Sequence, residues 1–135
     1  MIFFKKEEKN EKNFLTKVCA LLIHAAKIDE NYTTKEEEII KKTLEELGIE
    51  KEKIPKTIEN AKIIEENSNQ ILDFTREVKN LTEKNKIKIV ESLWSIIYSN
   101  KEADIYEANL MRRLAGLLYI DNKTMGDIKE KIKNK

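Results

Sequence analysis

The first polar segment of the chain carries residues that could bind a divalent cation. Asp29, Asn31 and Thr33 stand two positions apart, which is the spacing of the first three ligands in calcium-binding loops. Hard cations such as calcium and magnesium prefer oxygen ligands of this kind. Glu36, three residues further along, could add a carboxylate. The segment therefore indicates a metal site made of Asp29, Asn31 and Glu36.

A second segment repeats this arrangement 71 residues later. Asn100, Glu102 and Asp104 are again two positions apart, and Glu107 lies three residues beyond them. Here an amide replaces the leading aspartate, and Lys101 adds a positive charge that repels a cation. Asn100, Glu102 and Glu107 are thus the weaker set of candidate ligands.

Neither segment completes a calcium-binding loop. Such a loop needs Gly at its sixth position and a bidentate Glu at its twelfth. Those positions hold Thr34 and Ile40 in the first segment, and Ile105 and Met111 in the second. We therefore expect at most a weakly bound divalent cation, with an affinity no better than about millimolar.

The same residues fit a second interpretation, in which they begin helices. Thr33-x-x-Glu36 and Asp104-x-x-Glu107 both match the capping box, in which the first side chain accepts a hydrogen bond from the backbone of the glutamate, and the glutamate reaches back. Under this interpretation the two segments are helix caps and solvated turns, and they bind nothing.

The residues that could act as nucleophile or base do not form a recognisable set. Cys19 and His24 are five positions apart on one predicted helix, so they do not share a face. The chain contains no glycine-rich phosphate loop, no CxxC and no HExxH. We expect no enzymatic activity.

The charge balance argues against binding to nucleic acid. Lys and Arg number 26 and Asp and Glu 25, for a net charge of +1, so no single sign builds a long-range field. Lys84, Lys86, Lys88, Arg112 and Arg113 are interpreted as solvated helix faces. No window is apolar enough to span a membrane. A single cysteine fits a reducing compartment, and we expect a cytoplasmic protein.

Apolar residues recur at helical spacing along most of the chain. The spacing predicts helices over residues 13–28, 34–47, 51–66, 70–80, 83–99, 105–119 and 122–133. Gly48 stands where a left-handed cap would end the second helix, and Pro55 falls near the first turn of the third. Trp94 could belong to the core or to a partner surface. The predicted fold class is all-α, a compact bundle of about seven helices.

Helix, polar segment and helix occur twice. A shift of 71 places Leu22 on Leu93, Glu36 on Glu107 and Leu47 on Leu118. Two copies are too few for a solenoid, so we expect a pair of pseudo-symmetric helical hairpins.

These two copies, residues 25–36 and 93–107, resemble the tellurite-resistance TerB family. In that family an apolar helix is followed by Asp-Gly, a few variable positions and a Glu that opens the next helix. Residues 72–75 and 109–119 look like its uncharacterised stand-alone branch. The first Asp-Gly is Asp29-Glu30 here and the second is Asn100-Lys101, so both glycines are absent.

The resemblance implies a bacterial cytoplasmic bundle associated with tellurite or general stress resistance. It also implies a capacity to bind a divalent metal through the acidic segments, and no enzymatic activity. We expect residues 1–12 to be a loose charged lead-in and residues 13–135 a single domain. The expected function is an interaction module for an unidentified protein partner, or a homodimer, with a weak metal-binding sensor as the alternative.

Overall fold

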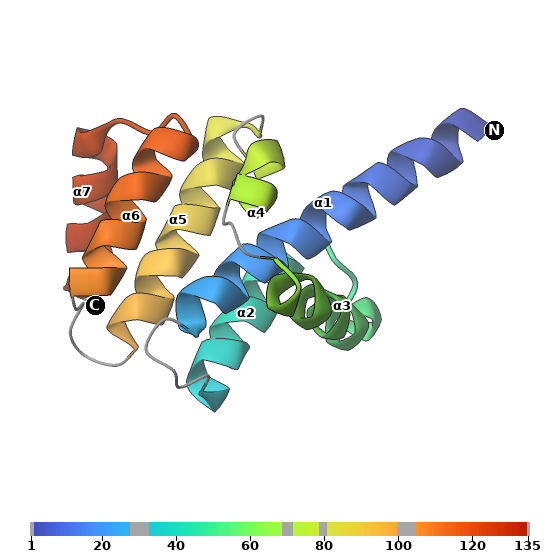
Figure 1. Cartoon of the computed structure of the whole chain (residues 1–135), viewed down its shortest axis with the longest axis horizontal. Helices are drawn as coiled ribbons and strands as arrows, with labels where there is room; N and C mark the ends of the chain where they lie inside the picture. The colour runs from blue at the N-terminus through green and yellow to red at the C-terminus, as the bar shows by residue number, and fades with distance from the viewer. Residues whose placement is uncertain (1, 28–32, 69–71, 79–80, 100–104, 135) are drawn as a thin grey trace.

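A computed structural model describes residues 2–27, 33–68, 72–78, 81–99 and 105–134 of the chain. The helices in these residues are α1 (Ile2–Ala26), α2 (Thr34–Glu46), the 3-10 turn η1 (Lys51–Lys53), α3 (Ile54–Glu66), α4 (Leu72–Val78), α5 (Glu83–Tyr98), α6 (Ile105–Leu117) and α7 (Asn122–Lys133). The described part contains no strand, so the predicted all-α fold is confirmed (Figure 1).

One prediction is wrong at the start of the chain. Residues 2–12, expected to be a loose lead-in, are helical and continue into α1. Figure 1 shows this first part of α1 extending away from the other helices. The reason is local, since residues 5–12 are rich in lysine and glutamate, which are good helix formers, and contain no glycine or proline.

Three side-chain oxygens cap the starts of helices, and one of them, Thr33, was predicted from the capping box. Thr33 accepts a hydrogen bond from the backbone N–H of Glu36 at α2, and Thr82 accepts one from Asn85 at α5. Asp121 accepts one from Thr124 at α7, with a distance of 2.7 Å. Asp104, expected to cap α6, lies outside the described residues.

α2 and α6 end in the same backbone arrangement. At α2, Gly48 has a φ of +105°, and the N–H of Ile49 donates to the carbonyl of Leu44. At α6, Tyr119 has a φ of +57°, and the N–H of Ile120 donates to the carbonyl of Ala115. Each is a Schellman motif. The left-handed residue Tyr119 therefore terminates α6 at Leu117, two residues before the predicted end.

The internal repeat extends to three helices. The first residues of α2 and α6 are 71 apart, and so are those of η1 and α7. α1 packs on α3 as α5 packs on α7, and α2 contacts α3 as α6 contacts α7. The described part is thus two three-helix units, α1–α3 and α5–α7, with α4 between them in sequence. The first eleven residues of the chain have no counterpart in the second unit.

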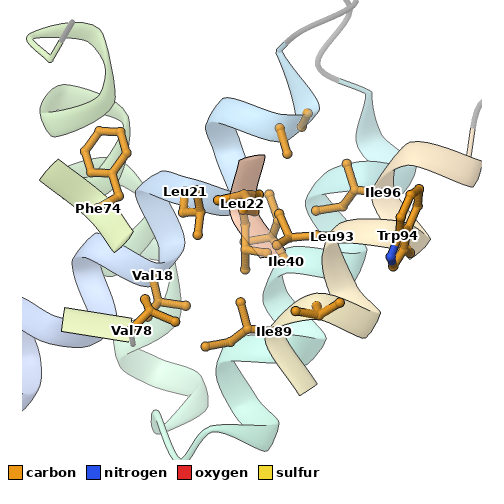
Figure 2. Packing of buried hydrophobic residues seen from close by; sticks show 14 of the residues in the cluster. Val18, Leu21, Leu22, Ile40, Phe74, Val78, Ile89, Leu93, Trp94 and Ile96 are labelled. Atoms are coloured by element: carbon orange, nitrogen blue, oxygen red, sulfur yellow. The ribbon is translucent and has the colours of Figure 1, made fainter. Parts of the chain in front are cut away.

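α1 is the central helix of the core. It contacts α2, α3, α4 and α5, and residues 18–23 are at most 1% exposed. A helix that is apolar on all sides is expected to be enclosed in this way. Figure 2 shows Leu22 beside Ile40 of α2 and Leu93 of α5, while Val18 and Leu21 lie on the side that faces α4.

Trp94 belongs to the core. It is 3% exposed, and its indole N–H donates to the sulfur of Met125 of α7 at 3.4 Å. Its ring stacks on Tyr98 with centroids 5.8 Å apart, and the Lys129 ammonium lies 5.5 Å from the ring. The side chain therefore joins α5 to α7 within the second unit.

Candidate functional site

The first polar segment ends in a complete capping box. Glu36 Oε1 accepts hydrogen bonds from the backbone N–H and from the hydroxyl of Thr33, both at 2.9 Å. The N–H of Glu36 donates to the Thr33 hydroxyl at 3.1 Å. Glu36 is only 1% exposed. The predicted capping box of Thr33 and Glu36 is therefore confirmed, and one carboxylate oxygen of Glu36 is engaged in it.

The predicted metal ligands fall mostly beyond what the structure describes. Asp29, Asn31, Asn100 and Glu102 lie outside the described residues, and Glu107 is placed in α6 without a described side chain. Glu36 is the one candidate whose side chain can be placed. The described residues contain no cluster of three His, Cys, Asp or Glu side chains that could hold a metal. The proposed ligand set stays a prediction.

A charged cluster that the sequence did not indicate lies beside the first segment. Glu65, near the end of α3, has a side chain that is 9% exposed. Its Oε2 accepts a hydrogen bond from the Lys27 ammonium at 2.8 Å, and its Oε1 lies 3.4 Å from Nδ1 of His24. Lys27 and His24 lie 38 and 41 positions before Glu65 in the sequence, so no local spacing could have linked them.

This cluster joins the last turn of α1 to the last turn of α3. The hydrogen bond that Lys27 donates to Glu65 raises the pKa of Lys27 above its usual value, so the ammonium stays charged. A buried carboxylate needs such a partner, because an unpaired charge is costly to remove from water. The single histidine of the chain is thus part of a contact between helices.

Cys19 is unsuited to nucleophilic chemistry. The thiol is fully buried in α1, and desolvation raises its pKa from 9.0 to about 12, although Lys62 acts in the opposite direction. The thiolate is the reactive form of cysteine. The side chain therefore acts as a small apolar core residue.

The hollow beside α2 is lined by charges of both signs. It measures about 440 Å³ and lies between α2 and the start of α3, bordered by Glu38, Lys41, Lys42 and Glu45 together with the η1 region. Glu45 and Lys51 face one another across it at 3.7 Å. The balance of charge favours solvent over a charged ligand.

Comparison with known proteins settles the family. The family described as tellurite resistance protein TerB matches residues 15–130. The chain belongs to the TerB family. No curated protein and no solved structure matches it. The TerB match spans both polar segments and ends within α7, and it begins inside α1, so the extending first part of that helix lies outside the family region.

The described reactive groups of this TerB chain have structural roles. Glu36 caps α2, Cys19 packs in the core, and His24 contacts Glu65. Lys84, Arg112 and Arg113 are exposed, as predicted. The prediction of a solvated position is wrong for Lys86, which is 5% exposed because it lies on the buried side of α5, where it pairs with Glu83 at 3.6 Å. No helix in the described ranges is long and apolar enough to cross a membrane.

Proposed function

We propose that this TerB chain is a non-enzymatic interaction module in a bacterial tellurite or stress-response system. Family membership supports the association with tellurite resistance. The observation that carries the module assignment is the engagement of Cys19, His24 and Glu36 in core packing, helix contact and capping. A catalyst needs reactive groups whose pKa lies near the operating pH and which substrate can reach, whereas an interaction module needs a stable surface.

Complementation of a deletion strain tests this assignment. Loss of the gene should increase sensitivity to tellurite, and the wild-type chain should restore growth. The double variant Cys19→Ala/His24→Gln should restore it equally, because neither side chain performs chemistry. A core variant such as Leu93→Asp should fail. Lost growth with the double variant, despite an unchanged circular dichroism spectrum, would indicate an enzyme.

Mild cross-linking in the source bacterium tests the partner directly. We expect at least one protein cross-linked in stoichiometric amount to the wild-type chain and not to the Leu93→Asp variant. Analytical ultracentrifugation of the purified chain checks the homodimer form of the same proposal. A chain that stays monomeric and yields no cross-linked protein under tellurite stress would contradict the module.

A weak divalent-metal sensor is the second candidate function. The buried Glu36 carboxylate at the edge of the first polar segment favours it, because Asp29 and Asn31 are close to it in sequence. The missing glycines and the single leading aspartate argue for low affinity, about millimolar. If a site exists, we expect it in the first segment rather than at Asn100, Glu102 and Glu107.

Calorimetry with calcium, magnesium and zinc decides between the two functions. We expect no affinity tighter than about millimolar for calcium or magnesium. Asp29→Asn should abolish any binding that is seen, while Asn100→Ala should leave it unchanged. A micromolar dissociation constant lost in Asp29→Asn would move the chain to the sensor class.

A further inference from the structure

The two units allow one helix face to be compared with its own counterpart. The shift of 71 places α6 on α2, and both helices end in a Schellman motif. The outer face of α2 carries acids and bases in alternation. These are Glu37, Glu38, Lys41, Lys42, Glu45 and Glu46. Such a face is typical of a solvated helix with ion pairs, and here Glu37 pairs with Lys62 of α3 and Glu45 with Lys51 of η1.

The outer face of α6 has no acidic residue at the positions equivalent to the glutamates of α2. The equivalent positions hold Ala108, Asn109, Arg112, Arg113, Gly116 and Leu117. Both lysines are arginines, and no acidic residue occurs between positions 108 and 117. Asn109, Arg112, Arg113 and Gly116 are exposed. At equivalent positions of the two units, the α2 face carries four glutamates and two lysines, whereas the α6 face carries two arginines and no acid.

Packing among the described residues does not require Gly116. It lies in the last turn of α6, and a Cβ built on it would meet none of their atoms within 4 Å outside the nearby backbone of its own helix. Glycine weakens a helix relative to residues with a side chain. Because glycine has no side chain, it leaves the helix backbone beside the arginines open to close approach by another chain.

Tyr119 occupies a backbone conformation that favours glycine. Its equivalent in the first unit is Gly48, which has the expected residue type for a left-handed cap. A bulky residue at positive φ is strained. Tyr119 is also 70% exposed. The backbone N–H of Tyr119 donates a hydrogen bond to the carbonyl of Gly116, so the two residues lie close together.

We propose that the outer face of α6, formed by Arg112, Arg113, Gly116 and Tyr119, binds an acidic segment of a partner protein. The guanidinium groups match carboxylates in paired hydrogen bonds. Tyrosine and arginine are the residues that most often anchor protein interfaces. Two arginines on a chain of net charge +1 are too few for nucleic acid, whose binding relies on many phosphate contacts. The inference rests on the proposed interaction module and names its surface.

A designed acidic peptide tests the charge preference. The probe is a fluorescein-labelled, 18-residue amphipathic peptide of Glu, Leu and Ala, and its all-Gln analogue is the control. By anisotropy, Arg112→Gln/Arg113→Gln should weaken binding by about tenfold or more. Lys41→Gln/Lys42→Gln removes the same charge from the equivalent face, and it should change the affinity by less than twofold.

Stability measurements separate a binding role from a structural one. Gly116→Gln and Tyr119→Gly should each raise the Tm by about 2–6 °C, because they remove a helix weakness and a backbone strain. Both should nevertheless weaken peptide binding several-fold. Glu45→Gln, at the position equivalent to Gly116, should leave binding unchanged. A lower Tm together with unchanged binding would make these residues structural.

Three outcomes overturn the inference. Equal loss of binding in the α2 and α6 double variants would mean a non-specific charge effect. Equal binding of the all-Gln peptide would exclude carboxylate recognition. Tighter binding of a 20-base-pair duplex DNA through the same arginines would assign the face to nucleic acid. A cross-linked cellular partner that Arg112→Gln/Arg113→Gln still retains would contradict this surface while leaving the interaction module intact.

Discussion

At the level of single residues, Asp121 connects a helix cap to solution pH. The backbone N–H of Thr124 donates to its carboxylate, and this hydrogen bond lowers the pKa of Asp121 below its usual value. A carboxyl group with a lowered folded-state pKa stabilises the fold above its unfolded pKa of about 4, and that contribution is lost as the pH falls through the folded value.

Asp121→Ala should therefore lower the urea midpoint at pH 7 and have a much smaller effect below about pH 3. Asp121→Ser keeps a capping oxygen that does not titrate, so its midpoint should be reduced little at either pH. Chemical unfolding of the three proteins at both pH values measures the difference. An equal loss for Asp121→Ala at both values would mean that the carboxylate does not cap α7.

At the level of elements, a buried pair of hydroxyl groups joins α2 to α5. The oxygens of Thr43 and Ser92 are 2.6 Å apart, and the hydroxyls also reach the carbonyls of Ile39 and Lys88 at 2.8 and 2.9 Å. Two hydroxyl protons serve three contacts, so the arrangement depends on both partners. Removing either hydroxyl removes the hydrogen bond between the helices, and the other hydroxyl keeps only its bond to the carbonyl of its own helix.

Thr43→Val and Ser92→Ala should each destabilise the fold by about 1–2 kcal/mol. The double variant should cost less than the sum of the single ones, because either single change already removes the hydrogen bond between the two hydroxyls. A double-mutant cycle in urea gives the coupling free energy. Strictly additive effects would show that the two hydroxyls act independently.

Sequence reasoning located the helices well because their limits are set locally. Thr33, Thr82 and Asp121 are recognisable caps, and Gly48 is a recognisable terminator. Tyr119 is not a recognisable terminator, because tyrosine has no preference for positive φ. The predicted end of α6 is therefore two residues too late.

Of the site, the capping role of Glu36 was predictable, because its partner Thr33 is three residues away. The contacts of Glu65 with His24 and Lys27 were not predictable, because they depend on the packing of α1 against α3 across about forty positions of sequence. The sequence repeat already identifies α2 as the reference for α6, but the exposure of Arg112, Arg113 and Tyr119 required structure.

At the level of the whole molecule, Cys19 can report on global unfolding. It lies in the most enclosed stretch of α1, and burial raises its pKa to about 12. At pH 8 the native thiol should therefore be almost unreactive toward iodoacetamide, whereas the unfolded chain should be labelled within minutes. Mass spectrometry of samples taken over a urea series should give a labelling midpoint equal to that from circular dichroism. Rapid labelling in native buffer would mean that α1 opens locally.

The enclosure of α1 has a consequence for how the protein is made. α1 is complete at Ala26, but its neighbour α5 ends only at Tyr98. At translation rates of about 5–20 residues per second, the 72 residues between these positions take about 4–14 s to add. During that interval the apolar stretch 18–23 emerges from the ribosome without the helix that covers one of its sides. The nascent chain then exposes an apolar segment of the kind that makes folding intermediates prone to aggregation, and the fold can close only after Tyr98 has been synthesised.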